Sequence, residues 1–291
     1  MLYHVDLTLP DLPACLDGLT VAHVTDLHID RHRRRHNRIF EALRGTETDL
    51  ALFTGDYMNR PADEAVTLEV MARLCACVRA RLGMIGVFGN HDSKAMRRML
   101  GELPIRWLCD ACYRPEGLPL EITGVDARGA HWPGDSLALL EHLGAMGHAG
   151  NGNGNGAGKG HGDGGGERAG VGAGHEGATG PRMLRLMLAH YPGYLPTAAD
   201  LGVDLVFSGH THGGQCRIPP NRALHNSSDL PMHLTSGILR LRRTLCVVSR
   251  GLGESLLPLR LFCPRHIPVY TIRRGPLAGQ ATEAMVNLRP W

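Results

Sequence analysis

Five short segments of this chain place residues with metal-binding side chains directly after an apolar run. The segments are VTDLH (Asp26, His28), FTGD (Asp56), FGNHD (Asn90, His91, Asp92), LAH (His190) and SGHTH (His210, His212). Residues two apart in an extended or tightly turned segment lie on the same side, so Asp26 and His28 can face one cavity. The same holds for His210 and His212. Because carboxylate, amide and imidazole groups all bind divalent cations, the segments together predict a metal site.

Each segment taken alone has a more ordinary interpretation. A histidine after a strand is more often a capping or hydrogen-bonded residue than a ligand, and a Gly-Asp pair more often forms a turn. Core packing, however, has no use for polar groups at five separate strand ends. The joint pattern therefore favours the metal site.

The elements that must position these side chains can be read from the hydrophobic pattern. In the first part of the chain, the apolar runs LTVAHVTD, DLALFTGD and GMIGVFGN alternate with helical patterns near 34–45, over 62–81 and from about Ser93. This order is typical of β-α-β units, which assemble sites at the ends of their strands. The later runs MHLTSGIL, RTLCVVSRG and HIPVYTIRR follow one another without helices. We therefore expect the chain to begin as α/β and to finish in antiparallel β structure.

A glycine-rich stretch at about 144–180, including NGNGNGAGKGHGDGGG, separates the two parts. Such a composition buries too little apolar surface to offset the backbone entropy that folding costs. We expect a disordered insert within a single domain that spans residues 1–291.

The composition is that of an ordinary globular protein. Hydrophobic residues make up 43%, charged residues 20%, and the formal net charge of +3 is too small to indicate a polyanion-coating protein. The eight cysteines lack the paired spacing of a zinc knuckle, which favours reduced thiols. Neither a signal peptide nor a run of about 20 apolar residues is present. These features favour a cytoplasmic location and leave peripheral attachment to a membrane open.

The five segments occur in the order D-x-H, G-D, G-N-H-[DE], H and G-H-x-H, and this order resembles the calcineurin-like metallophosphoesterases. The resemblance spans about residues 21–212. It implies a four-layer α/β/β/α sandwich, in which two mixed sheets pack face to face and helices cover both outer faces. The segments GHTHGGQ and SRGLGESLLPLRLFCP are also similar to a bacterial branch with membrane-associated phosphoesterases and a UDP-2,3-diacylglucosamine hydrolase of lipid A synthesis.

The resemblance implies a dinuclear metal centre. One ion would be held by Asp26, His28 and His212, the other by Asn90, His190 and His210, and Asp56 would bridge them. A carboxylate suits the bridging position because its two oxygens bind two cations and its charge offsets their repulsion. Oxygen and nitrogen ligands without thiolate leave Mn²⁺, Fe, Zn²⁺ and Mg²⁺ as candidates, and we expect Mn²⁺ in an assay.

The resemblance also implies the catalytic roles. Two divalent cations would supply hydroxide near neutral pH and neutralise phosphate oxygens. His91 would stabilise or protonate the leaving oxygen, and Asp92 would orient the imidazole through a hydrogen bond. A purely structural role for His91 is the alternative. The expected substrate is a phosphodiester or diphosphate of a lipid or nucleotide-sugar type.

Two further segments each fit two interpretations. Arg33, Arg34 and Arg35, in a basic run after Asp30, either bind a second phosphate or an anionic lipid head group, or simply start a solvated helix. Residues 252–262, LGESLLPLRLF, either contact a membrane or acyl chains, or are buried in the second sheet. We expect the burial.

Two other functions fit the sequence less well than a phosphoester hydrolase. A nuclease of the same fold would require a basic groove with interleaved aromatic residues, whereas aromatic residues make up only 5% of the chain, so nucleic acid is not the expected partner. A non-catalytic metal-binding scaffold would be expected to have lost ligands, whereas every expected ligand type is present.

Overall fold

The computed structural model describes residues 1–127, 182–219, 222–279 and 283–291. The glycine-rich stretch at about 144–180 lies outside the described residues, so its expected disorder stays a prediction.

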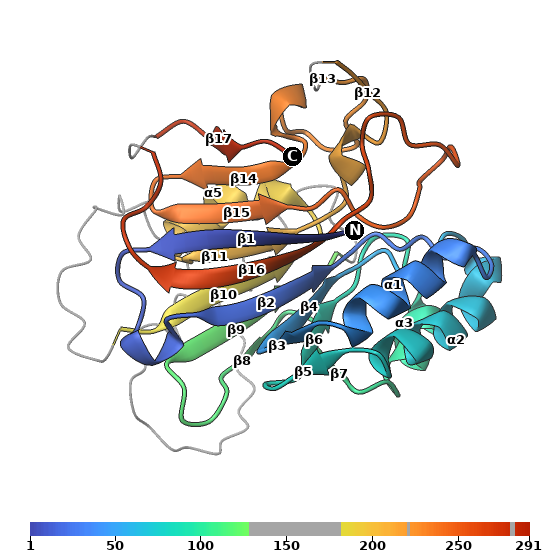
Figure 1. Ribbon diagram of the computed structural model, residues 1–291, viewed down its shortest axis with the longest axis horizontal. Helices are drawn as coiled ribbons and strands as arrows, with labels where there is room; N and C mark the ends of the chain where they lie inside the picture. Colours follow the sequence, from blue (N-terminus) through green and yellow to red (C-terminus); the bar gives the residue numbers. More distant parts are fainter. Residues whose placement is uncertain (128–181, 220–221, 280–282) are drawn as a thin grey trace, which may run out of the picture.

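Two mixed β-sheets form the centre of the molecule (Figure 1). The first contains, in spatial order, β1 (Leu2–Leu9), β16 (Ile267–Arg274), β2 (Leu19–Val24), β4 (Leu50–Thr54), β6 (Met84–Val87) and β7 (Ile105–Trp107). The second contains β17 (Val286–Arg289), β14 (Gly237–Leu241), β15 (Thr244–Val248), β11 (Leu205–Ser208), β10 (Leu184–Ala189), β9 (Leu120–Val125) and β8 (Ala111–Tyr113). Each sheet combines parallel pairs, such as β2 with β4 and β10 with β11, with antiparallel pairs.

Helices cover the outer faces of both sheets. Three of them, α1 (Arg34–Arg44), α2 (Glu64–Cys75) and α3 (Lys94–Leu100), pack on the first sheet, and α5 (Leu195–Asp200) packs on the second. Two short pairs, β3 (Glu47–Thr48) with β5 (Arg79–Ala80) and β12 (Arg217–Ile218) with β13 (Arg222–Ala223), lie outside the sheets. The four-layer α/β/β/α sandwich expected from the sequence is confirmed.

The central strands are apolar on both faces because both faces are covered. In β4, Leu50 and Leu52 pack into the core between the sheets, whereas Ala51 and Phe53 pack against the helices. Such a strand shows a continuous apolar run instead of an alternating one. His23 of β2 is fully buried, and its Nε2 lies 2.8 Å from Thr54 Oγ1, as expected for a core histidine.

The end of the chain follows the expected antiparallel arrangement in part. Strand β14 pairs antiparallel with β15 and with β17. Strand β16 returns to the first sheet, where it is antiparallel to β2 but parallel to β1. The expected helix over 62–81 also ends early, at Cys75, since Arg79 and Ala80 pair with Glu47 and Thr48.

The predicted burial of residues 252–262 in the second sheet is wrong. Leu252 is buried, but Leu256 is 89% and Leu257 is 63% exposed. Apart from one isolated bridge between Leu261 and Cys216, the backbone makes tight turns, with Leu257 N donating to Ser255 O and Leu259 N donating to Leu257 O. Pro258 lacks the N–H that a strand would need at this point, which explains why an apolar run does not become a strand.

No helix in the described parts of the chain is both long and apolar enough to cross a bilayer.

Candidate metal centre

The candidate ligands follow strands of both sheets at the edge where the carboxyl ends of these strands meet. Asp26, Asp56, His190 and His210 each come one or two residues after β2, β4, β10 and β11, respectively. The turns are hydrogen-bonded to one another: Asp26 N donates to Gly55 O at 3.0 Å, and Gly209 N donates to His190 O at 3.1 Å. The fold therefore brings together side chains that lie far apart in the sequence.

Glycines before the ligands allow the turns to approach this closely. A Cβ atom on Gly89 would overlap Asp56 Oδ1, and a Cβ atom on Gly209 would overlap the carboxylate of Asp26. The small residues in FGN and SGH are therefore required by close packing at the centre.

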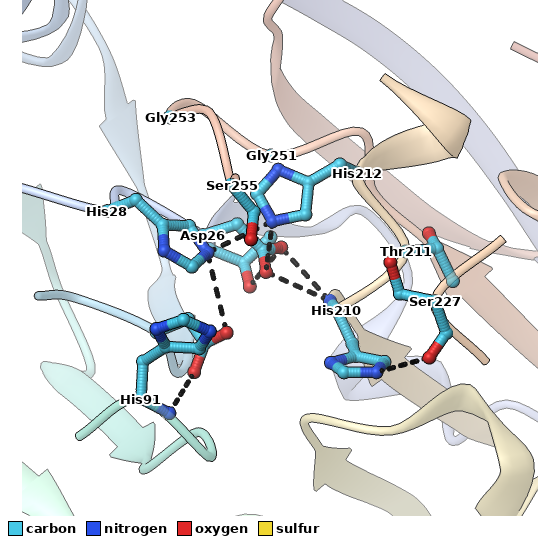
Figure 2. Close-up of polar contacts among 12 residues, drawn as sticks. Asp26, His28, His91, His210, Thr211, His212, Ser227, Gly251, Gly253 and Ser255 are labelled. Carbon is cyan, nitrogen blue, oxygen red and sulfur yellow. Dashed lines mark hydrogen bonds and ion pairs between the residues drawn. The ribbon is translucent and has the colours of Figure 1, made fainter. Parts of the chain in front are cut away.

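Six of the seven proposed ligands, together with His91, form three overlapping groups whose ligand atoms lie within 4.8 Å of one another. The groups are Asp26, His28 and His212; His28, Asp56 and His91; and Asp56, His190 and His210. Figure 2 shows the rings of His28 and His212 close to the carboxylate of Asp26. Asp56 Oδ2 lies 3.4 Å from His28 Nε2 and 3.1 Å from His190 Nε2, a position suited to a carboxylate shared by two cations.

The hydrogen bonds of His190 and His210 test whether a cation fits between them. His190 Nδ1 lies 2.7 Å from the carbonyl oxygen of Thr54, and His210 Nε2 lies 2.9 Å from that of Ser227. A carbonyl can only accept, so both of these nitrogens carry hydrogen. In the neutral rings, the lone pairs are then on His190 Nε2 and His210 Nδ1, which face each other at 3.3 Å. Two facing lone pairs next to a carboxylate fit a bound cation.

The charges of this site favour a positive charge beside Asp56. Burial alone raises the pKa of Asp56, but the charges and hydrogen bonds of His190 and His28 together outweigh burial and hold this pKa well below its ordinary value. Burial lowers the pKa of His190, whereas the charge of Asp56 and its hydrogen bond raise this pKa. The net result of these effects is a pKa of about 9. The carboxylate thus stabilises positive charge at the position where a cation would bind.

His212 has a different set of contacts. Its Nε2 lies 3.0 Å from His28 Nε2 and 3.6 Å from Asp26 Oδ1. Its Nδ1 lies 3.3 Å from Arg260 Nη2, and a guanidinium can only donate. This contact favours a proton on Nε2 of the neutral ring, so cation binding through Nε2 requires that proton to leave.

The backbone at the candidate ligands is strained. Asp26, His28, Asp56, His210 and His212 all have positive φ, between 40° and 69°. Residues other than glycine rarely adopt this conformation, and such strain is concentrated at functional sites. The left-handed turns direct these side chains into the cluster.

The expected hydrogen bond between Asp92 and His91 is replaced by other contacts. The Asp92 carboxylate accepts from the backbone N–H groups of Asp56, Tyr57 and Gly89 at 2.8–2.9 Å. His91 Nδ1 lies 3.0 Å from the carbonyl oxygen of Asn59. Asp92 therefore holds the turn that carries Asp56, because its carboxylate is buried against three backbone donors. The Asn59 carbonyl, instead of a carboxylate, orients His91.

The remaining predicted residues lie around the cluster. Asn90 is exposed in the turn after β6, directly before His91. Arg33 donates through Nε to Asp30 at 2.8 Å, and Arg35 forms an ion pair with Glu254 at 2.8 Å. Arg34, at the start of α1, is exposed. Of the three arginines, Arg34 is the exposed one, whereas Arg33 and Arg35 are half-buried.

Two residues near the cluster are not indicated as site residues by the sequence pattern. The Tyr191 ring lies edge-on to His210, with ring centroids 4.4 Å apart. Its position directly after His190 is a signal that could have been used. Arg260 contacts His212 across 48 positions of the chain, and no local pattern could have indicated it.

Comparison with known proteins adds to this geometry. The sequence pattern of calcineurin-like phosphoesterases matches residues 19–214. The uncharacterized metallophosphoesterase YkuE of Bacillus subtilis (strain 168) is 24% identical over 275 residues, which cover 90% of this chain and 82% of YkuE. The uncharacterized metallophosphoesterase YkoQ of the same organism is 22% identical over 256 residues, covering 84% of this chain and 79% of YkoQ.

Among solved structures, the NAD nucleotidase NadN of Haemophilus influenzae is similar with a TM-score of 0.44 and 11% identity. The match covers 81% of this chain and 45% of that protein, so this chain spans less than half of its length.

Proposed function

Because the chain belongs to the calcineurin-like phosphoesterase family and is therefore a metal-dependent enzyme acting on phosphoester bonds, we propose that it hydrolyses phosphodiesters or diphosphates at a dinuclear centre. Asp26, His28 and His212 would hold one ion, Asn90, His190 and His210 the other, and Asp56 both. When bound, two divalent cations neutralise phosphate oxygens and lower the pKa of the attacking water. Mn²⁺ is the ion we propose for assays, with Fe, Zn²⁺ and Mg²⁺ as alternatives.

One observation carries this proposal. Carbonyl acceptors hold hydrogen on His190 Nδ1 and His210 Nε2, so the other two ring nitrogens face each other beside the Asp56 carboxylate, where a cation would replace the proton that His190 otherwise carries. This arrangement is unfavourable in a buried core without positive charge and favourable around a cation.

His91 is the proposed catalytic acid. Its Nδ1 donates to the Asn59 carbonyl, so the ring must also carry a proton on Nε2, as an imidazolium, to give that proton to the leaving oxygen. Asp92 acts through the backbone of the Asp56 turn and is a positioning residue.

The test compares the metal-loaded protein with the Asp56→Asn variant. We expect the wild-type protein loaded with Mn²⁺ to hydrolyse bis-p-nitrophenyl phosphate, and the Asp56→Asn variant to lose this activity and to bind less metal by elemental analysis. The control is Asp110→Asn, since Asp110 is exposed and accepts one backbone hydrogen bond from Asp126. Equal metal content and activity in wild type and Asp56→Asn would refute the proposal.

We further propose a lipid or nucleotide-sugar diphosphate, such as UDP-2,3-diacylglucosamine, as the natural substrate class. The exposed Arg34 supports this choice, because it precedes Arg35, whose guanidinium contacts the carbonyl oxygens of Leu27 and His28, and an exposed guanidinium can bind a second phosphate. A panel of lipid-linked and nucleotide diphosphates tests it; turnover of simple diesters alone would argue against it.

We also propose a cytoplasmic location with peripheral contact to the membrane. The four buried cysteines, Cys75, Cys77, Cys246 and Cys263, are reduced thiols, which is typical of a reducing compartment. Fractionation of cells that produce the protein tests this location.

A further inference from the structure

Exposed apolar side chains are concentrated beside the candidate metal centre. Of the ten exposed large apolar side chains in the described parts of the chain, seven come from residues 256–262, from β12 and from Leu224 directly after β13, which points to one surface instead of scattered exposure. They are Ile218, Leu224, Leu256, Leu257, Leu259, Leu261 and Phe262. We call these seven side chains the apolar rim.

The apolar rim is bonded to the segment that carries His212. Leu261 N donates to Gln215 O at 3.1 Å, and Arg217 N donates to Leu261 O at 2.8 Å. The Gln215 side chain also donates to Leu257 O at 2.9 Å. Figure 1 shows the loop before β16 beside β12 and β13. Any surface that covers the rim therefore lies next to the metal centre.

Arginines outnumber carboxylates next to the apolar rim. Glu254 contacts three arginines, Arg35 from α1 and Arg260 and Arg265 from the loop, of which Arg265 is the most exposed, at 33%. Arg31, just before α1, is 71% exposed and lies 3.9 Å from Asp30. Four guanidinium groups thus face two carboxylates, and the net charge next to the rim is positive.

The combination of apolar and basic side chains indicates which kind of partner can cover the apolar rim. Apolar side chains enter the boundary between head groups and acyl chains, and arginines attract anionic head groups. A second copy of this chain would bring the same positive charge to the contact, which opposes self-association.

We propose that the apolar rim inserts into the surface of an anionic lipid bilayer. Docking would allow head-group phosphates to reach the metal centre from the membrane side. This consequence, unlike docking itself, rests on the proposed function. The docking itself needs no catalysis.

The first test is binding of the full chain to vesicles of phosphatidylcholine with phosphatidylglycerol. We expect Leu256→Ser/Leu257→Ser to weaken binding by about tenfold for each leucine, since burying such a side chain contributes roughly that factor. The matched control, Leu256→Met/Leu257→Met, keeps apolar side chains at both positions and retains binding. Thermal unfolding of each variant checks that the fold is intact.

Two further variants separate charge from insertion. Arg31→Gln weakens binding by about fivefold, the contribution of one arginine near an anionic surface, whereas Arg44→Gln, at the opposite end of α1, does not. In Leu257→Trp, vesicles shift the fluorescence of the new indole to shorter wavelength.

Several outcomes would overturn the docking proposal. They are full binding by the serine variant, equal binding to vesicles of phosphatidylcholine alone, and a dimer in sedimentation that the serine variant dissociates. Docking needs no catalysis, so we expect Asp56→Asn to bind vesicles as the wild-type protein does. If the wild-type protein fails to hydrolyse bis-p-nitrophenyl phosphate, the proposed function is refuted, whereas docking is decided by vesicle binding alone.

Discussion

The hydroxyl of Tyr57 links the turn of Asp56 to strand β6, and its removal should be costly. Tyr57 is fully buried, donates to Val87 O at 2.8 Å and accepts from Gly55 N at 3.1 Å. Tyr57→Phe leaves both backbone groups buried without their partner. Each such group costs about 1–3 kcal/mol, so we expect the free energy of unfolding to fall by about 3 kcal/mol.

The chain offers a matched control at Tyr270, which is also fully buried. Its hydroxyl has no hydrogen-bond partner among the described residues. Tyr270→Phe removes only an unsatisfied polar group, so stability should stay the same or rise.

Urea unfolding at neutral pH and calorimetry measure the difference between the two variants. For a chain of this size, about 3 kcal/mol corresponds to a melting temperature lower by about 6 °C in Tyr57→Phe. Because Gly55 precedes Asp56, the residue proposed to bridge the two ions, metal affinity should also fall, by about tenfold. Equal unfolding free energies for Tyr57→Phe and Tyr270→Phe would refute the reasoning.

Three other predictions follow from the same geometry. Gly89→Ala should reduce bound metal and hydrolysis because its Cβ overlaps Asp56, whereas Gly193→Ala, with open space around it, should not; unchanged metal content in Gly89→Ala would contradict this. Burial lowers the pKa of His23 to about 3, below the value of about 6.5 in the unfolded chain. The neutral His23 side chain therefore contributes fully to stability above pH 6.5, and this contribution is lost as the pH falls toward 3. The stability difference between wild type and His23→Gln should therefore narrow by about 2 kcal/mol from pH 7 to pH 5 in urea unfolding, and a constant difference would argue against it. Arg34→Gln should raise KM for a diphosphate substrate and leave kcat unchanged, and an unchanged KM would assign Arg34 to the solvated surface.

The strand-end segments could be predicted because they are local. Each ligand type follows an apolar run, and parallel strands bring their carboxyl ends to one edge, so the convergence of Asp26, Asp56 and His190 follows from pattern and topology. The structure brings together six of the seven proposed ligands, and Asn90 lies exposed beside them. Their role in metal binding stays a prediction.

The contacts that orient these residues could not be predicted. The Asn59 carbonyl reaches His91 across 32 positions, and Arg260 reaches His212 across 48. Backbone carbonyls are present at every residue, so the sequence gives no sign of which one will orient a ring. The positive φ angles of Asp26 and His28 likewise arise from tertiary packing and not from residue type.

The misassigned loop at residues 252–262 has a different cause. A run of leucines is equally compatible with a core strand and with an exposed apolar surface. Pro258 and the tight turns on either side decide the outcome, and only the three-dimensional structure shows where the leucine side chains point.

The candidate ligands come from both sheets: Asp26 and Asp56 follow strands of the first, and His190 and His210 follow strands of the second. Cations held by all four would cross-link the two halves of the sandwich across their shared apolar interior. Bound metal would then hold the two sheets together in addition to supporting catalysis. Removing the metal with a chelator would weaken the packing between the two sheets before either sheet unfolds.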